Sequence, residues 1–200
     1  FTIEDILIKP TWEEVPQKDQ DKLLIQIDPG TAFGTGMHET TQLCIRQLKK
    51  YIHSGMELLD VGTGSGILSI VGLKLGAKHA VGTDLDPNAI SAAKENMLAN
   101  EISEKQFEVQ IGNIIEDSVL QQEIGFEKYD IAVANILADI ILLLQTEIAK
   151  HIKVGGYFIT SGILESKRQI VETALTENVN FELVETITQG EWVSITARRK

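Results

Sequence analysis

Three glycines spaced two apart follow an acidic strand end in the stretch Asp60-Val61-Gly62-Thr63-Gly64-Ser65-Gly66. The apolar run before them and the amphipathic segment after them predict a strand, a tight turn and a helix. Glycine is needed in such a turn because the backbone requires positive φ and because side chains would keep a ligand from the backbone. The pattern is typical of α/β folds that hold an adenine-containing cofactor at the carboxyl edge of a parallel sheet.

The spacing of these glycines favours one class of cofactor. A dinucleotide-binding loop has the pattern G-x-G-x-x-G, whereas here the third glycine comes one residue early and Ile67 occupies the required position. S-adenosyl-L-methionine contains no pyrophosphate, so its loop need not aim a helix N-terminus at one. We therefore expect Gly62 and Gly64 to bind S-adenosyl-L-methionine. A nicotinamide-dependent oxidoreductase and a non-catalytic cofactor-binding module are the alternatives from other classes.

Two polar residues follow the next two predicted strands. Asp84 ends the second strand, at the distance from Gly62 at which an acid accepts hydrogen bonds from ribose hydroxyls. Its alternative role is to cap the next helix, for which Asp86 is the better candidate. Asn113 follows the third strand, where its side chain could bind the adenine edge while Ile114 packs on the ring. Turn chemistry explains the Gly-Asn pair about as well.

Asn135 opens the stretch Asn135-Ile136-Leu137-Ala138, directly after an apolar fourth strand. The carboxyl end of that central strand is where the chemistry of such a fold is expected. The carboxamide oxygen accepts a hydrogen bond from an incoming amine but does not take up a proton at neutral pH. We therefore expect Asn135 to position an amine and not to act as a base. A helix N-cap is its alternative role.

The most distinctive stretch is Phe33-Gly34-Thr35-Gly36-Met37-His38-Glu39-Thr40-Thr41. Two glycines predict a loop, and Thr40 and Thr41 then stand in the first turn of a helix. Hydroxyls and free N–H groups at a helix start suit a carboxylate, such as that of the cofactor's methionine part, although ordinary capping explains both threonines too. Phe33 is expected to cover the reacting centre. The four histidines have no ligand spacing, so no metal site is predicted.

The elements that must position these residues alternate between strand and helix from Glu57 onward. Apolar runs predict strands near 57–61, 79–84, 107–111, 129–134 and 155–161, and amphipathic patterns predict helices near 65–75, 87–99, 137–151 and 165–176. Two β-like runs within 181–198, separated by Gln189-Gly190, predict a closing antiparallel hairpin. This order implies an α/β fold with a mostly parallel sheet and helices on both faces.

The composition fits one α/β domain of 200 residues, 43% hydrophobic and 24% charged, preceded by a short extension. Residues 1–22 are polar and are expected to be a linker or an arm, and residues 23–200 to be the domain. A net charge of −11 disfavours a phosphate backbone and suits a basic protein or a small molecule. One cysteine, no secretory pattern and no apolar run near the roughly 20 residues of a membrane span predict a cytoplasmic protein.

Four parts of the chain carry a resemblance to a known family: Phe33–Thr41, Asp60–Gly66, Asp84 and Asn135–Ala138. Together they are similar to the bacterial large-subunit ribosomal protein 11 methyltransferase (PrmA) family, over about residues 28–200. The resemblance implies a class I S-adenosylmethionine-dependent methyltransferase with a seven-stranded sheet. It places the family's cofactor contacts on Thr41, Gly62, Asp84 and Asn135.

The family's substrate is a ribosomal protein that is methylated on lysine ε-amino groups and on the N-terminal α-amine. The resemblance therefore implies a protein-lysine N-methyltransferase with a basic ribosomal protein as partner and no direct nucleic-acid contact. It also implies that residues 1–22 join the domain to a missing N-terminal substrate-recognition domain. A methyltransferase acting on another amine, an amide or a nucleic acid would share the fold. However, the Asn135 motif lacks the prolines and the aromatic of the N-P-P-Y type, and the acidity disfavours nucleic acid.

Overall fold

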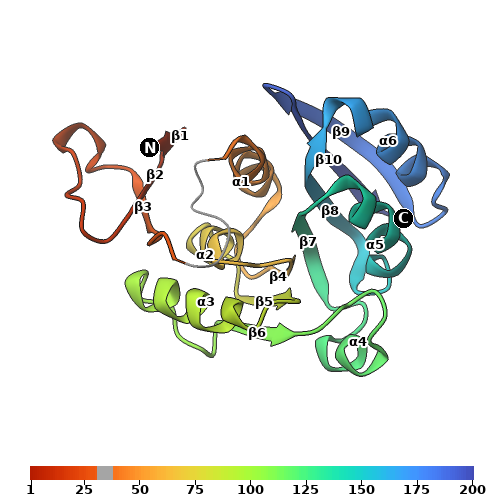
Figure 1. Ribbon diagram of the computed structural model, residues 1–200, viewed down its shortest axis with the longest axis horizontal. Helices are drawn as coiled ribbons and strands as arrows, with labels where there is room; N and C mark the ends of the chain where they lie inside the picture. Colours follow the sequence, from red (N-terminus) through yellow and green to blue (C-terminus); the bar gives the residue numbers. More distant parts are fainter. Residues whose placement is uncertain (31–37) are drawn as a thin grey trace.

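Figure 1 shows the structure, a computed structural model that describes residues 1–30 and 38–200. The strands of its main sheet are β4 (Glu57–Val61), β5 (His79–Asp84), β6 (Phe107–Ile111), β7 (Tyr129–Asn135), β8 (Ile152–Leu164), β9 (Phe181–Gln189) and β10 (Trp192–Arg199). They lie in the order β6-β5-β4-β7-β8-β10-β9. The first five of this order are parallel, whereas β10 pairs antiparallel with β8 and β9. The sheet is therefore mostly parallel and ends in an antiparallel hairpin, as predicted.

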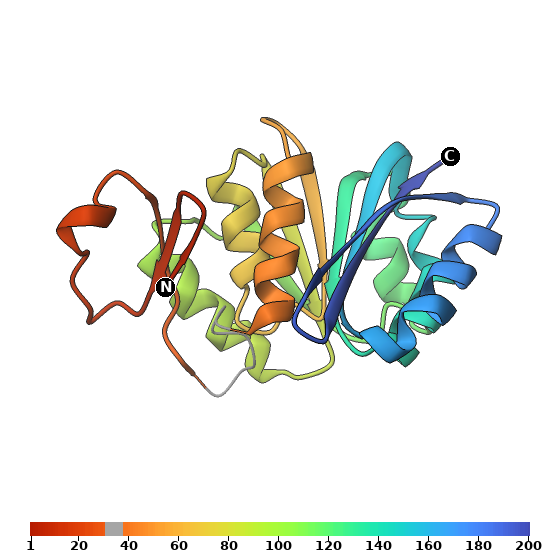
Figure 2. The same ribbon diagram turned by 90° about the horizontal axis from the view of Figure 1, so that it is seen from above.

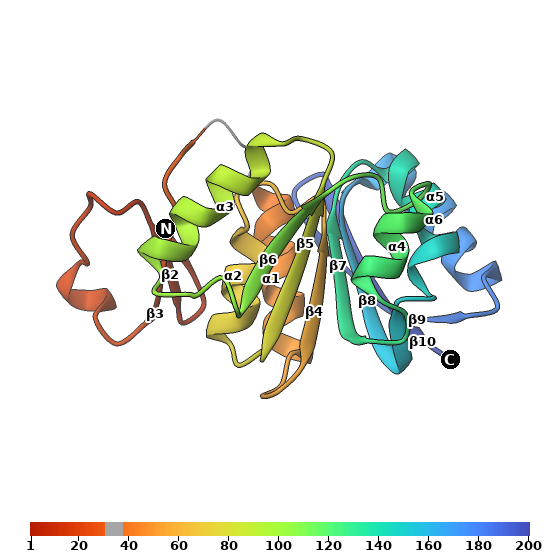
Figure 3. The same cartoon turned by 90° about the horizontal axis from the view of Figure 1, so that it is seen from below.

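Helices cover both faces of this sheet (Figures 2 and 3). One face carries α1 (Glu39–Tyr51), α2 (Ile67–Lys74) and α3 (Asn88–Ala99), and the other carries α4 (Ser118–Ile124), α5 (Ala138–Ile148) and α6 (Arg168–Glu177). A short 3-10 helix, η2 (Glu165–Lys167), precedes α6. Each layer buries its own apolar cluster against the sheet, so the central strands are covered on both sides and are nearly continuous apolar runs.

Successive side chains of a strand point to opposite faces of the sheet. Leu58 packs in the cluster beneath α1 and α2, and its neighbour Leu59 packs in the cluster beneath α5 and α6. Asp60, next in β4, returns to the α1 and α2 side. Asn135 lies on that same side at the end of β7, two residues beyond Val133. The two polar residues thus meet helices of one layer at the carboxyl edge of the sheet.

Residues 1–27 form a second, smaller sheet beside α3, at the opposite end of the molecule from the C-terminus (Figures 1 and 2). Its strands are β1 (Thr2–Ile3), β2 (Ile6–Lys9) and β3 (Leu23–Gln26), with a 3-10 helix, η1 (Gln17–Asp19), between the last two. β2 is antiparallel to β1 and parallel to β3. Ile6, Ile8 and Ile25 are buried in the same cluster as the residues of α1 and α2. The expected linker or arm therefore contains ordered strands packed on the core, while its connection to a further domain stays a prediction.

The other expected elements are confirmed within a few residues at their ends. The main sheet domain also contains α4, a seven-residue helix that the apolar pattern did not predict. Its N-cap is Asp117, whose carboxylate accepts hydrogen bonds from two first-turn N–H groups. The N-cap of α3 is Pro87, and the expected cap Asp86 lies one residue earlier, where its Oδ1 accepts the Asn88 N–H at 2.9 Å. Within the described residues, no helix is long and apolar enough to cross a membrane.

Candidate functional site

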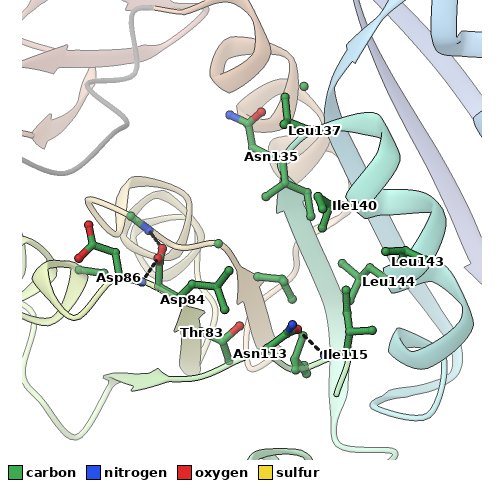
Figure 4. Close-up of a pocket in the computed structure, with 18 of the residues that line it drawn as sticks. Thr83, Asp84, Asp86, Asn113, Ile115, Asn135, Leu137, Ile140, Leu143 and Leu144 are labelled. Carbon is green, nitrogen blue, oxygen red and sulfur yellow. Dashed lines mark hydrogen bonds between the residues drawn. The ribbon is translucent and has the colours of Figure 1, made fainter. Parts of the chain in front are cut away.

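A pocket of about 730 Å³ opens at the carboxyl ends of β4, β5, β6, β7 and β8 (Figure 4). Most of the residues predicted to form the site line this one pocket: Thr40, Gly62, Gly64, Asp84, Asn113 and Asn135. Phe33, which was expected to cover the reacting centre, lies outside the described residues. The loops after five neighbouring strands and the start of α1 thus bring together residues that are up to 95 positions apart in the chain (40 and 135).

The glycine loop has the backbone that its sequence predicted. Gly62, Gly64 and Gly66 have φ values of +72°, +52° and +80°, a region that residues with a Cβ rarely adopt. A Cβ on Gly62 would lie 2.8 Å from Ile136 Cγ2. The N–H groups of Gly62 and Thr63 both donate to Thr83 O, at 2.8 and 3.0 Å. The loop is therefore held against the end of β5 with its bare backbone facing the pocket.

Asp84 joins the glycine loop to the turn after β5. Its Oδ2 accepts the Gly64 N–H at 2.8 Å, and its Oδ1 accepts the Asp86 N–H at 2.9 Å, as the dashed lines of Figure 4 mark. A carboxylate has about four acceptor positions, so each oxygen can accept one further bond from a hydroxyl in the pocket. Asp84 therefore shapes the loop and can also bind a diol, which its sequence position had predicted.

Asp60 lies under the glycine loop and has a role that we did not predict from the sequence. Its side chain is buried, and its Oδ2 accepts the hydroxyls of Thr63 and Ser69, each at 2.8 Å. Burial raises the pKa of Asp60 to about 6, although these two hydroxyls favour the ionised form. The other oxygen, Oδ1, is buried with no hydrogen-bond partner among the described residues. The signal in the sequence was an acid inside an apolar strand, which has to be explained by a partner or by function.

Asn135 lies at the end of the central strand β7 and is fixed by α1. Its Nδ2 donates to Thr41 Oγ1 at 3.2 Å. Thr41 is buried behind the wall of the pocket, so it reaches the site through Asn135. Gly162 of β8 approaches closely, since a Cβ there would lie 2.4 Å from Ile136 O and 3.2 Å from Asn135 Oδ1. The Asn135 Nδ2 is thus engaged by Thr41, and the amide oxygen Oδ1 is left to accept a hydrogen bond from a ligand.

The start of α1 is more fully capped than its sequence suggested. His38 is the N-cap, and its Nδ1 accepts the Thr40 N–H at 3.3 Å and lies 2.9 Å from Thr40 Oγ1. Both the N–H and the hydroxyl of Thr40 are therefore engaged with His38 and are not free for a carboxylate in this structure. The His38 ring also packs edge to face on Trp192, with ring centroids 5.0 Å apart. His38 and Trp192 together border the pocket on this side.

The remaining wall is apolar and unusually exposed. Figure 4 shows Asp84 and Asp86 facing Leu137, Ile140 and Leu143 of the α5 side across the pocket. Leu137 is 72% exposed and Leu143 is 57% exposed, and Leu85, which also lines the pocket, is 71% exposed. Apolar side chains open to water in a pocket are typical of a ligand site. We did not single them out from the sequence, because exposure of a leucine is not visible in a helical pattern.

Asn113 forms the turn after β6 and also lines the pocket. Its Oδ1 accepts the Ile115 N–H at 3.0 Å, so the turn chemistry is present. Its amide nitrogen has no hydrogen-bond partner among the described residues, and its contact with an adenine ring stays a prediction. Ile114 is buried in the core beneath, with one surface on the pocket. Within residues 1–30 and 38–200, no cluster of His, Cys, Asp and Glu is arranged to hold a metal ion.

Comparison with known proteins assigns the family. The profile of the ribosomal protein L11 methyltransferase (PrmA) family matches residues 2–200. The chain belongs to the ribosomal protein L11 methyltransferase family. It is 56% identical over its whole length to the ribosomal protein L11 methyltransferases of Lachnospira eligens and Agathobacter rectalis. It spans 63% and 62% of the length of these relatives, respectively.

The fold of this family is also found among solved structures. The crystal structure of ribosomal protein L11 methylase from Lactobacillus delbrueckii subsp. bulgaricus matches with a TM-score of 0.86 and 35% identity, over 98% of this chain and 95% of that one. A putative S-adenosylmethionine-dependent methyltransferase from Streptococcus mutans matches with a TM-score of 0.68 at 11% identity, over 88% of this chain and 57% of that one, which shows a shared fold alone. The class I methyltransferase fold expected from the sequence is therefore confirmed.

Proposed function

We propose that this chain is the catalytic part of an S-adenosyl-L-methionine-dependent protein N-methyltransferase that methylates ribosomal protein L11. The observation that carries the proposal is the Asn135 amide, held by Thr41 at the edge of a pocket that also contains the glycine loop and Asp84. Membership of the ribosomal protein L11 methyltransferase family supports the choice of substrate. Such a substrate would place the activity in the cytoplasm.

The residues that line the pocket fit this cofactor. The bare backbone of Gly62 and Gly64 leaves room for the methionine part, and the carboxylate of Asp84 has acceptor positions left for two ribose hydroxyls. Asn113 and Ile114 would meet the adenine ring, and the exposed side chain of Leu85 offers it an apolar surface. When bound, S-adenosyl-L-methionine supplies a methyl group on a positively charged sulfur.

The acceptor amine would be held by Asn135. The Thr41 hydroxyl engages the nitrogen end of this amide, so the oxygen is left to accept an N–H of the amine and to orient its lone pair. Trp192 and His38 would wall the acceptor side. Asp139, at the start of α5, is 3.5 Å from Lys167 and its side chain is 76% exposed, so it does not face this site as a base. We therefore assign the chain's contribution to positioning and desolvation.

The amine has to lose a proton before it attacks. A lysine ε-amine with a pKa near 10.4 requires about 4.6 kcal/mol at pH 7, whereas an α-amine with a pKa near 7.8 requires about 1 kcal/mol. The apolar wall of Leu137, Ile140 and Leu143 disfavours the charged ammonium and lowers this requirement. We propose that lysine ε-amines are substrates because this wall supplies the desolvation that they need, and that an α-amine is also accepted.

The proposal is tested with the full-length protein, purified ribosomal protein L11 and S-adenosyl-L-methionine carrying a deuterated methyl group. Mass spectrometry of intact L11 and of its peptides should show labelled methyl groups on amino groups. Asn135→Ala should lose most of this transfer. Asn180→Ala is the matched control because Asn180 is exposed on the segment before β9, outside the pocket lining.

Two results would contradict the proposal. Label that appears on carboxylates or nucleic acid, and not on L11 amines, would assign another substrate. Oxidation of a substrate with NAD, and no methyl transfer, would assign the chain to the dehydrogenase class.

A further inference from the structure

Two buried asparagines of α3 and its C-cap hold the chain that leads from the N-terminal sheet to the pocket. Asn96 and Asn100 are one helical turn apart, so their amides leave the same face of the helix, and they are 3% and 4% exposed. The Asn100 amide pairs with both backbone groups of Gln26. The Gln26 N–H donates to Asn100 Oδ1 at 2.8 Å, and Asn100 Nδ2 donates to Gln26 O at 2.6 Å. Asn100 therefore completes the free edge of β3.

Asn96 binds two segments that are far apart in the chain. Its Oδ1 accepts the backbone N–H of Asp28 at 3.1 Å, and its Nδ2 donates to the backbone oxygen of Ser65 at 2.9 Å. Ser65 lies between Gly64, which lines the pocket, and Gly66, which begins α2. One buried amide thus joins the cofactor loop to the segment that follows β3.

Asp28 in turn binds Thr11 of the N-terminal arm (residues 1–22). Its carboxylate accepts the Thr11 N–H at 2.7 Å and the Thr11 hydroxyl at 2.9 Å. A continuous path of hydrogen bonds therefore runs from Thr11 through Asp28 and Asn96 to Ser65. The bonds between Thr11 and Asp28 are exposed, the bond between Asp28 and Asn96 is partly buried, and the bond between Asn96 and Ser65 is buried. Hydrogen bonds are electrostatically stronger in such a buried setting than in water.

We propose that Asn96 is a positioning residue that couples the placement of the N-terminal arm to the affinity of the glycine loop for S-adenosyl-L-methionine. The inference rests on the cofactor site proposed above. If the arm shifts Asp28, the Asn96 amide either follows and moves Ser65 or loses a buried hydrogen bond, which is unfavourable. A contact that displaces the arm would therefore change the affinity of the glycine loop for S-adenosyl-L-methionine.

The test compares two matched variants of the full chain by calorimetric titration with S-adenosyl-L-methionine. Asn96→Asp keeps an acceptor for the Asp28 N–H but replaces the donor to Ser65 O by a carboxylate oxygen. Asn100→Asp makes the same change one turn away, where the amide holds Gln26 and does not reach the glycine loop. Asn96→Asp should weaken binding about tenfold or more, the effect of losing one buried hydrogen bond, and Asn100→Asp less than about threefold. Asn96→Ser replaces Asn96→Asp if the carboxylate prevents folding.

The coupling itself is measured with Asp28→Ala, which releases Thr11 and leaves the backbone N–H of position 28 in place. This change should weaken cofactor binding severalfold in the parent chain and have no further effect in the Asn96→Asp background. Equal losses in both backgrounds, or equal losses in the Asn96→Asp and Asn100→Asp variants, would overturn the inference.

A readout without cofactor separates this inference from the proposed function. Amide hydrogen exchange of residues 62–67 should accelerate in Asp28→Ala when Asn96 is present and show no further increase when it is replaced. An unchanged exchange rate would overturn the coupling. A parent chain that shows this exchange pattern and does not bind S-adenosyl-L-methionine would overturn the proposed function alone.

Discussion

Replacement of Asp60 by asparagine should change the pH dependence of stability in a defined direction. Burial raises the pKa of Asp60 from 3.8 to about 6 in the folded chain. Between these two values the unfolded chain has lost the proton while the folded chain keeps it, so the parent loses stability as the pH rises. Well below pH 3.8 and well above pH 6 this group contributes no slope.

The magnitude follows from the shift. Roughly two pKa units at about 1.36 kcal/mol each give a loss of about 3 kcal/mol in the parent between about pH 4 and pH 7. The amide introduced by Asp60→Asn does not titrate, and the Thr63 and Ser69 hydroxyls, which donate to Asp60 Oδ2, can donate in the same way to the amide oxygen. The free energy of unfolding of Asp60→Asn, relative to the parent, should therefore rise by about this amount over the same range.

The assay is urea denaturation at half-unit steps from about pH 4 to pH 8, with Asp60→Asn beside the parent. Asp21→Asn is the control, because it removes the same charge from an exposed position in the arm. A difference between Asp60→Asn and the parent that stays constant across this range, or that shrinks as the pH rises, would refute a raised pKa for the carboxyl beneath the glycine loop.

Three further predictions concern the pocket. Asp84→Ala should weaken S-adenosyl-L-methionine binding by about 1–3 kcal/mol, the scale of a hydrogen bond to a charged group; unchanged affinity by calorimetry would remove Asp84 from the site. Asn135→Ala should lower turnover more than cofactor affinity, so equal losses in kinetics and calorimetry would make it a cofactor ligand only. Gly62→Ala should destabilise the fold by about 1–2 kcal/mol through its φ of +72° and should also weaken cofactor binding. Gly55→Ala, with φ of +86° and no atom within 4 Å, isolates the backbone part in the same denaturation experiment and should leave binding unchanged.

Much of the fold could be predicted because its signals are local. Strands such as β4 and β7 are apolar runs bounded by turn residues, and the alternation of strands with helices implies the parallel order. The hairpin of β9 and β10 was visible in the same way, through its Gln189-Gly190 turn. These elements carry their own periodicity, so their position needs no knowledge of distant contacts.

The elements that were missed depend on partners elsewhere in the chain. β1 and β2 have two and four residues, too few for a periodic signal. They are held by pairing with each other, by pairing of β2 with β3, and by burial of Ile6 and Ile8. α4 is a single short segment whose start depends on the Asp117 cap. In such cases tertiary packing, not local pattern, decides the structure.

In the candidate site too, residues with local sequence signals could be predicted, whereas residues whose role depends on distant contacts could not. Gly62, Gly64 and Asp84 could be assigned from the sequence because strand-end position and glycine spacing have direct physical meaning. The role of Asn96 could not, because it consists of bonds to residues 31 and 68 positions earlier in the chain. Thr41 shows an intermediate case: its place at the start of a helix was confirmed, but its described contact is with Asn135, behind the pocket wall.

The proposed binding of S-adenosyl-L-methionine in this pocket depends on the glycine loop and Asp84. The decisive measurement is calorimetric titration of the folded chain with S-adenosyl-L-methionine, with NAD in a parallel titration. We expect the parent to bind one equivalent of S-adenosyl-L-methionine, Asp84→Ala to bind it more weakly, and NAD not to bind. Binding of NAD with no binding of S-adenosyl-L-methionine, or S-adenosyl-L-methionine affinity that is indifferent to Asp84, would contradict this expectation.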